Sequence, residues 1–102
     1  MAAAEIFRAL GDPIRLEMVQ RLTRDRRCTI TDISEGLGIT RQGARKHLQV
    51  LANAQVVVLQ PEGRDVLVSL SPETLDQAKL FITELELRWD ARLAALRRFV
   101  EE

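Results

Sequence analysis

The sequence predicts a mainly α-helical fold with one small β-hairpin, the α+β class, and three observations support this prediction. Apolar residues recur at helical spacing in several segments. Two β-rich apolar runs, at residues 56–60 and 66–70, are separated by a polar stretch that contains Pro and Gly. As the third observation, residues 72 to about 100 carry an unbroken apolar seam at helical spacing, which predicts one long helix. The length of 102 residues suits a single domain over residues 1–102.

Four helices are expected before the hairpin. Their periodic apolar residues place them at residues 2–10, 13–23, 32–37 and 41–53, with a brief strand at residues 29–30. Asp12 is expected to cap the second helix, with Pro13 at its first position, where the missing N–H costs nothing. Thr31 and Thr40 are expected to cap the third and fourth helices, and Gly38 to end the third.

The hairpin and the last helix complete the predicted topology. Residues 61–65 form the expected tip between the two strands, and Ser71 is expected to cap a helix that starts at Pro72. A short helix, a turn that contains glycine and a longer helix, followed by a two-stranded ribbon, are typical of a winged helix-turn-helix. The predicted order is therefore helix, helix, helix, helix, hairpin, long helix.

The charge distribution favours a nucleic-acid partner although the net charge is zero. Residues 41–64 carry Arg41, Arg45, Lys46 and Arg64 against the single acid Glu62. Residues 71–102 carry seven acids against five bases. A DNA-binding face needs positive potential only locally, and the basic middle segment can supply it although the whole protein is neutral.

Three segments resemble the ArsR/SmtB family of bacterial regulators. Residues 9–16 read ALGDPIRL and are similar to the family's opening "ALxDPTRxxIL". Residues 39–51 read ITRQGARKHLQVL and resemble its recognition segment "LSQSTVSHHLKVL", and residues 60–64 resemble its wing. The resemblance covers nearly the whole chain. It implies a transcriptional repressor that binds double-stranded operator DNA.

The family's metal sites are not expected here. Its motif "ELCVCDL" aligns with residues 27–33, where Thr29 and Thr31 take both cysteine positions, and threonine is a poor ligand for thiolate-preferring metals. The family's second site uses His on the final helix, and this final helix has none. The resemblance is therefore to a branch without the metal motifs. We expect no metal and no cofactor, and the sequence does not identify an effector.

The predicted DNA-binding residues lie on the helix at 41–53 and on the wing. Gln42, Arg45 and Lys46 share one face and are the candidates to read bases, because Arg pairs with guanine and Gln with adenine. The residues expected to contact phosphates or the minor groove are Thr40, Arg41, His47 and Arg64. A simple solvated polar face remains the alternative. Gly43 would allow a close approach either to DNA or to a neighbouring helix, and both readings stay open.

The last helix predicts a homodimer. Its apolar seam exceeds what one small domain can cover. The family resemblance implies that the first helix joins it, so residues 1–10 and 72–101 are the predicted dimerisation helices. The seam residues and their expected partners on the first helix are Leu75, Ile82, Leu85, Trp89, Leu93 and Leu96, with Ile6 and Phe7. The alternative is that the helix folds back over its own core.

Two other functions remain open, and one class is disfavoured. A winged-helix module that binds protein in place of DNA is one alternative, and a repressor switched by oxidation of Cys28 is another. An enzyme is not expected, because no nucleophile has an identifiable base and no phosphate-binding glycine loop occurs. No apolar run approaches the roughly 20 residues of a membrane span, so we expect no membrane partner and a cytoplasmic protein.

Overall fold

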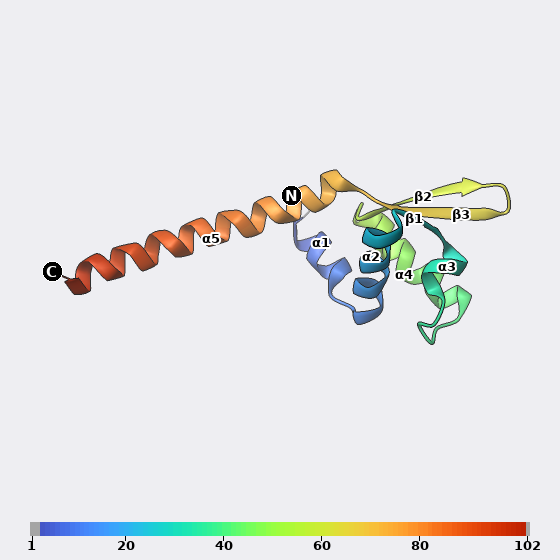
Figure 1. Cartoon of the computed structure of the whole chain (residues 1–102), viewed down its shortest axis with the longest axis horizontal. Coiled ribbons are helices and arrows are strands. Elements are labelled where there is room, and N and C mark those ends of the chain that lie inside the picture. Colours follow the sequence, from blue (N-terminus) through green and yellow to red (C-terminus); the bar gives the residue numbers. More distant parts are fainter. Residues whose placement is uncertain (1–2, 102) are drawn as a thin grey trace.

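The computed structural model describes residues 3–101 and confirms the predicted class, a mainly helical fold with a small antiparallel sheet (Figure 1). The elements are α1 (Ala3–Leu10), α2 (Pro13–Asp25), β1 (Arg27–Thr29), α3 (Ile30–Ser34), α4 (Arg41–Asn53), β2 (Val57–Glu62), β3 (Asp65–Leu70) and α5 (Pro72–Glu101). Their order is the predicted one. Ala2, expected to begin the first helix, lies outside the described residues.

The sheet has three antiparallel strands in the order β1-β3-β2. Residue pairing in the hairpin continues to Glu62 and Asp65, so the turn holds only Gly63 and Arg64, and the predicted five-residue tip is wrong. Gly63 has a φ of 59°, which a tight hairpin turn with glycine at its first central position requires. Pro61 lies inside β2, which is tolerated because β2 is an edge strand.

The short helix α3 begins and ends earlier than predicted. It covers Ile30–Ser34, and its cap is Thr29, whose Oγ1 accepts a hydrogen bond from the Asp32 N–H at 3.1 Å; the prediction that Thr31 caps this helix is wrong. The predicted end at Gly38 is also wrong. Gly36 already has a positive φ of 77°, which breaks the helix two residues before Gly38 is reached.

The other helix starts agree with the sequence more closely. Asp12 accepts from the Ile14 N–H at 3.3 Å with Pro13 in the first turn, and Thr40 accepts from the Gly43 N–H at 2.9 Å. At the start of α5 the Ser71 carbonyl accepts from the Leu75 N–H. The Ser71 hydroxyl, however, accepts from a side chain, the hydroxyl of Thr74 at 3.2 Å.

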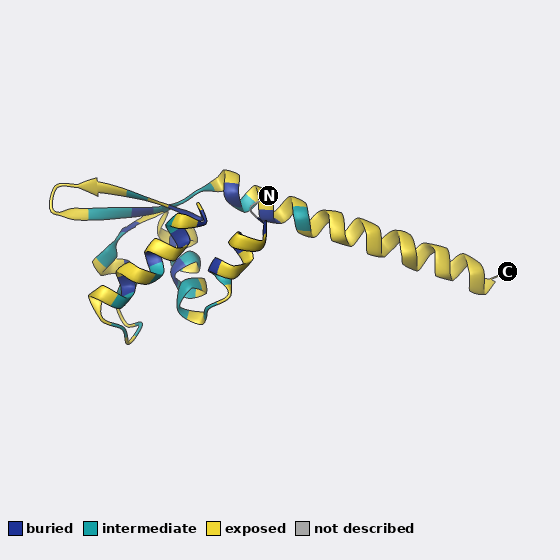
Figure 2. Cartoon of the chain, turned by 180° about the vertical axis from the view of Figure 1, so that it is seen from behind, coloured by how far each residue is buried: buried dark blue, intermediate teal, exposed yellow. Residues whose placement is uncertain are grey.

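The hydrophobic core lies between the four short helices and the sheet. Its largest fully buried side chains are Ile6, Met18, Leu22, Ile33, Leu48, Leu51, Val56 and Val68. The first turns of α5 contact α1, and the rest of the helix extends away from the domain with its residues exposed (Figure 2). The chain therefore measures 68 × 25 × 22 Å, with a radius of gyration of 18.1 Å. A compact domain of this length would have about 13 Å.

Over residues 3–101, no helix has both the length and the apolar composition that crossing a bilayer requires.

Candidate nucleic-acid interface

Helix α4 presents one apolar and one basic face. Ala44, Leu48 and Leu51 are completely buried and anchor the helix in the core. The four polar residues that the sequence assigned to DNA in the first turns, Arg41, Gln42, Arg45 and Lys46, are all exposed. This separation follows from the 3.6-residue repeat of a helix.

The presence of glycine at position 43 has a local structural reason that the sequence did not reveal. A Cβ at this position would lie 3.3 Å from Oγ1 of Thr40 and 3.8 Å from Cβ of Ile39. The crowding atom is therefore the hydroxyl that caps the same helix, and not an atom of a neighbouring helix. Glycine at this position leaves room for the Thr40 side chain to accept the Gly43 N–H.

Three arginines from two distant segments line one small surface cleft. Arg41 and Arg45 come from α4, and Arg64 comes from the turn of the wing. Thr31 of α3 and Asp65 of β3 also line this arginine cleft, with Ile30 and Val66 as its apolar part. Three guanidinium groups against one carboxylate leave the cleft with excess positive charge, and guanidinium suits phosphate oxygens.

The sequence identified these arginines one at a time but did not predict that they converge. Arg64 follows Arg45 by 19 residues, and only the return of the hairpin over α3 and α4 brings them to one site. Thr31 was missed as a site residue, because it was expected to cap α3. Since Thr29 takes that role, the exposed Thr31 is free to line the cleft.

His47 lies apart from this cleft. Its ring is half-buried against the start of α2, where Nδ1 is 3.1 Å from Nη1 of Arg15. Arg15 and Asp12, which the sequence did not assign to the site, are therefore neighbours of α4, the predicted recognition helix. No periodic pattern could have found a contact across 32 residues.

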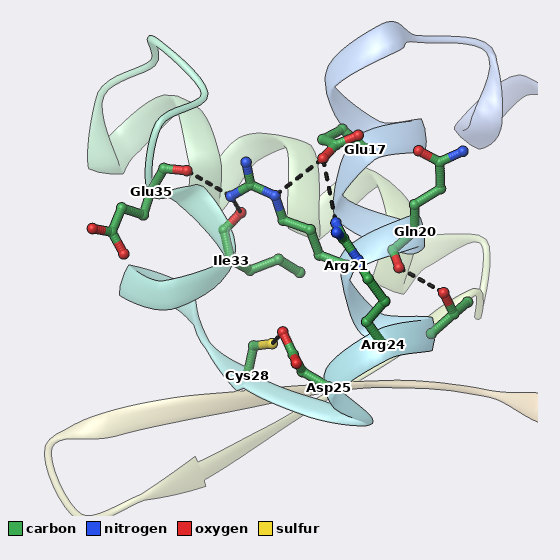
Figure 3. Close-up of polar contacts among 9 residues, drawn as sticks. Glu17, Gln20, Arg21, Arg24, Asp25, Cys28, Ile33 and Glu35 are labelled. Atoms are coloured by element: carbon green, nitrogen blue, oxygen red, sulfur yellow. Dashed lines mark hydrogen bonds and ion pairs between the residues drawn. The ribbon is translucent and has the colours of Figure 1, made fainter.

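A polar network fixes α3 against α2 (Figure 3). The Arg21 guanidinium donates from Nε to Glu17 at 3.3 Å and from Nη1 to the carbonyls of Ile33 at 3.2 Å and Glu35 at 2.6 Å. Arg24 pairs with the same Glu17 carboxylate at 3.7 Å. Arg21 thereby satisfies carbonyls at the end of the five-residue helix α3, which has little hydrogen bonding of its own.

Cys28 lies beside this network and is buried (Figure 3). Burial raises the pKa of its thiol, the negative charges of Asp25 and Asp32 raise it further, and Arg21 lowers it. Its Sγ is 4.0 Å from a carboxylate oxygen of Asp25. A buried thiol whose pKa is raised holds its proton at neutral pH, which weakens the case for a redox switch at this residue.

The residues at the family's metal positions do not fit a metal ion. The Thr29 hydroxyl caps α3, and Thr31 lines the arginine cleft. In the part of the chain from residue 3 to residue 101, no three His, Cys, Asp or Glu side chains form a group that could hold a metal.

The outer part of α5 carries an exposed apolar face. Five of the predicted dimerisation residues on this helix are exposed: Ile82, Leu85, Trp89, Leu93 and Leu96. Leu75 packs partly on the core of its own chain. The rings of Phe7 and Phe81 contact each other in a tilted arrangement, with their centroids 5.7 Å apart. Ile6 is completely buried in the protomer, so its assignment to a dimer contact is corrected: it belongs to the core of its own chain.

Together, the helix pair α3–α4 and the three-stranded sheet with its hairpin define a winged helix-turn-helix protein. A sequence model described as "Helix-turn-helix domain" matches residues 10–60. The chain belongs to the ArsR/SmtB family of winged helix-turn-helix transcriptional regulators. Members of this family are regulators and not enzymes, as the sequence predicted.

Two curated relatives share about a third of the aligned residues. The HTH-type transcriptional repressor SmtB of Mycobacterium tuberculosis is 34% identical over 74 residues, which cover 72% of this chain and 54% of that protein. The transcriptional repressor SmtB homolog of Synechocystis is 31% identical over 68 residues, covering 67% and 51%. The chain thus spans about half the length of the curated relatives it matches.

Solved structures share the fold over most of the chain. An ArsR-like transcriptional regulator from Rhodococcus sp. RHA1 superposes with a TM-score of 0.81 at 26% identity, covering 96% of this chain and 92% of that one. A second ArsR family transcriptional regulator has the same TM-score at 21% identity, with 87% and 91% covered. The second likeness is one of fold alone.

Proposed function

We propose that this protein is a cytoplasmic transcriptional repressor that binds an inverted-repeat operator as a homodimer. The arginine cleft carries the proposal, because it joins the recognition helix and the wing into one basic surface. The names of the two relatives, both transcriptional repressors, support the direction of regulation. Binding near a promoter would then exclude the polymerase.

The site residues divide into base-reading and phosphate-binding groups. Gln42, Arg45 and Lys46 are exposed on the side of α4 opposite its core face, as base reading in the major groove requires. Arg41 and Arg64, with Thr40 at the helix start, are the proposed phosphate contacts. Arg45 lines the arginine cleft as well, so it stands between the two groups.

A second copy of the chain is the proposed cover for the outer part of α5. The exposed face includes Trp89 at 60% and Leu85 at 49% exposure, and a lone helix would leave these side chains in water. Dimers with a two-fold axis place two recognition helices in successive major grooves about 34 Å apart, which requires an inverted-repeat operator.

The charges of α5 favour an antiparallel pair of helices. Residues 72–86 carry Glu73, Asp76, Glu84 and Glu86 against Lys79. Residues 87–101 carry Arg88, Arg92, Arg97 and Arg98 against Asp90 and Glu101. An antiparallel arrangement sets the acidic half of each helix beside the basic half of its partner, whereas a parallel one sets like charges together.

Regulation is proposed to differ from that of metal-responsive relatives. Threonine hydroxyls at the two aligned cysteine positions cannot supply the thiolates that such a site needs.

The experiment is selection of bound duplexes from a random DNA library, followed by affinity measurements on the selected sequence. We expect an inverted repeat. Arg45→Ala and Gln42→Ala should weaken binding to the selected sequence far more than binding to random DNA. Arg24→Ala, which removes an exposed arginine of α2 outside the cleft, is the control. Failure to retain any DNA at low salt would favour the protein-binding module.

A further inference from the structure

The recognition helix is tied to the corner between α1 and α2 through His47. Nδ1 of His47 lies 3.1 Å from Nη1 of Arg15 and 3.9 Å from a carboxylate oxygen of Asp12. The same Asp12 oxygen is 4.0 Å from Nη1 of Arg15. The three side chains are largely shielded, with exposed fractions of 24% for His47, 17% for Arg15 and 19% for Asp12.

Both partners of His47 are themselves held in place. Arg15 donates from Nε to the carbonyl of Ala9 and from Nη2 to the carbonyl of Arg8, at the end of α1. Asp12 uses its other carboxylate oxygen to accept from the Ile14 N–H at 3.3 Å, which caps α2. Because these bonds hold the Arg15 guanidinium in a fixed orientation, its Nη1 points toward the imidazole ring of His47.

This geometry selects one neutral tautomer of the imidazole. A guanidinium has only donors, so at 3.1 Å the Nδ1 atom of His47 must accept. A neutral imidazole that accepts at Nδ1 carries its proton at Nε2. The charged groups that face the ring, Arg15 and Asp12, both come from the α1–α2 corner, and Arg45 and Lys46 on its own helix are exposed.

We propose that Arg15 is a positioning residue for DNA binding: it holds His47 as the Nε2–H tautomer, so that Nε2 donates a hydrogen bond to a DNA phosphate oxygen. Asp12 supports this arrangement by capping α2 and pairing with Arg15. This inference rests on the proposed DNA-binding function. It explains why the recognition segment combines arginines on its exposed face with a half-buried histidine: the arginines bring charge, and the histidine brings one directed neutral donor.

The first test uses the free protein and does not depend on DNA. His47 is the only histidine in the chain, so a protein labelled with ¹⁵N-histidine gives a single pair of ring nitrogen signals. We expect the signal of a protonated Nε2 and of an unprotonated Nδ1 in the wild type. In Arg15→Gln the two tautomers should mix. A proton on Nδ1 in the wild type, or unchanged signals in Arg15→Gln, would overturn the tautomer assignment.

The second test measures DNA affinity. His47→Asn keeps an acceptor near the position of Nδ1 but has nothing at the position of Nε2, and we expect roughly tenfold weaker binding to all sequences. Because the lost donor is neutral, the dependence of affinity on salt should not change, whereas Arg41→Ala should lower the salt slope by about one. His47→Gln, whose amide reaches toward the Nε2 position, should restore part of the affinity.

Thermal unfolding of each variant is measured first, because Arg15 also binds the carbonyls that end α1. If Arg15→Gln does not fold, the two His47 variants decide the outcome, since they leave those bonds in place. Wild-type binding by a folded His47→Asn would show that His47 is an internal link only and would overturn the proposed phosphate contact. If the wild type itself binds no DNA, the proposed function fails, while the tautomer result still stands or falls by the spectrum.

Discussion

Single arginine side chains, brought together from different elements, supply the positive charge of the candidate interface. Arg41, Arg45 and Arg64 are each exposed to solvent. A single exposed arginine contributes little free energy to an ionic contact, because water screens its charge. Convergence on the arginine cleft changes this, because several guanidiniums can share one anionic group. Sequence periodicity predicted which α4 residues face outward. It could not predict convergence, which depends on how the hairpin returns over the helices.

Arg45 and Arg64 should therefore be energetically coupled in DNA binding. Each single alanine substitution should cost about 1–3 kcal/mol of binding free energy. The double variant should cost less than the sum, because each arginine contributes most when the other is present. Fluorescence anisotropy with a labelled operator measures the four affinities. Strict additivity would mean that the two side chains bind separate groups, and Arg24→Ala paired with Arg64→Ala is the additive control.

Cys28 gives the protein a predictable response to alkaline pH. Burial raises the pKa of the thiol in the folded state, so the folded state keeps this proton to a higher pH than the unfolded state does. The stability that this provides is complete below the pKa of an unfolded cysteine, about 8.5, and is lost as the pH rises through the folded-state pKa. The free energy of unfolding should fall above about pH 8.5 in the wild type and fall less in Cys28→Ala.

Urea unfolding at a series of pH values measures this difference, and the chain contains no tyrosine to titrate in the same range. The same alkaline slope in both proteins would contradict the assignment. Loss of DNA binding after mild oxidation of the wild type, but not of Cys28→Ser, would restore the redox-switched repressor as the better account.

The start of each helix depends on which side chain caps it, that is, on which side chain accepts a hydrogen bond from a free backbone N–H of the first turn. The boundaries of α4 were predicted because Thr40 precedes a clear apolar repeat. For α3, both Thr29 and Thr31 are good caps, and a helix of five residues has too short a repeat to decide between them. Strand β1 was predicted at residues 29–30 but covers Arg27–Thr29. Its position was missed because its pairing with β3 is a long-range contact that leaves little local signal in the sequence.

The start of α4 provides a test of the cap. Thr40→Ala should destabilise the protein by about 1 kcal/mol, since it removes the acceptor of the Gly43 N–H. Gly43→Ala should gain little in the wild type, because its Cβ would press on Oγ1 of Thr40 at 3.3 Å. In the Thr40→Ala background that atom is gone, and Gly43→Ala should gain about 0.5–1 kcal/mol. Equal effects of Gly43→Ala in both backgrounds would show that the cap does not restrict residue 43.

The elongated shape of the whole molecule is the main support for the proposed homodimer. A helix of 30 residues is about 45 Å long, and only its first turns rest on the domain (Figure 2). The sequence predicted this helix and its apolar seam well, because a long repeat is the strongest local signal. It assigned Ile6 to the same surface incorrectly, since periodicity shows that a residue faces inward but not which apolar surface covers it.

Charging the α5 face should separate the protomers. Leu85→Glu introduces a carboxylate into the apolar seam at a position that is 49% exposed. Because burying an unpaired charge between two helices costs free energy, we expect a monomer in sedimentation at concentrations where the wild type is a dimer. Val58→Glu is the matched control, because Val58 is 51% exposed on the edge strand β2 and outside this face. The emission of the single Trp89 should shift to shorter wavelength with wild-type concentration only if the helices pair. A monomeric wild type, or a dimeric Leu85→Glu, would contradict the proposed interface.

The affinity of the selected operator for the wild type and for the triple variant Arg41→Ala, Arg45→Ala, Arg64→Ala tests the central claim most directly. Sedimentation first establishes that both proteins have the same assembly state, so that only the arginine cleft differs. We predict that the triple variant binds more than about a hundredfold more weakly and shows a shallower salt dependence. Operator binding by the triple variant within about twofold of the wild type would contradict the claim that this cleft is the DNA-binding surface.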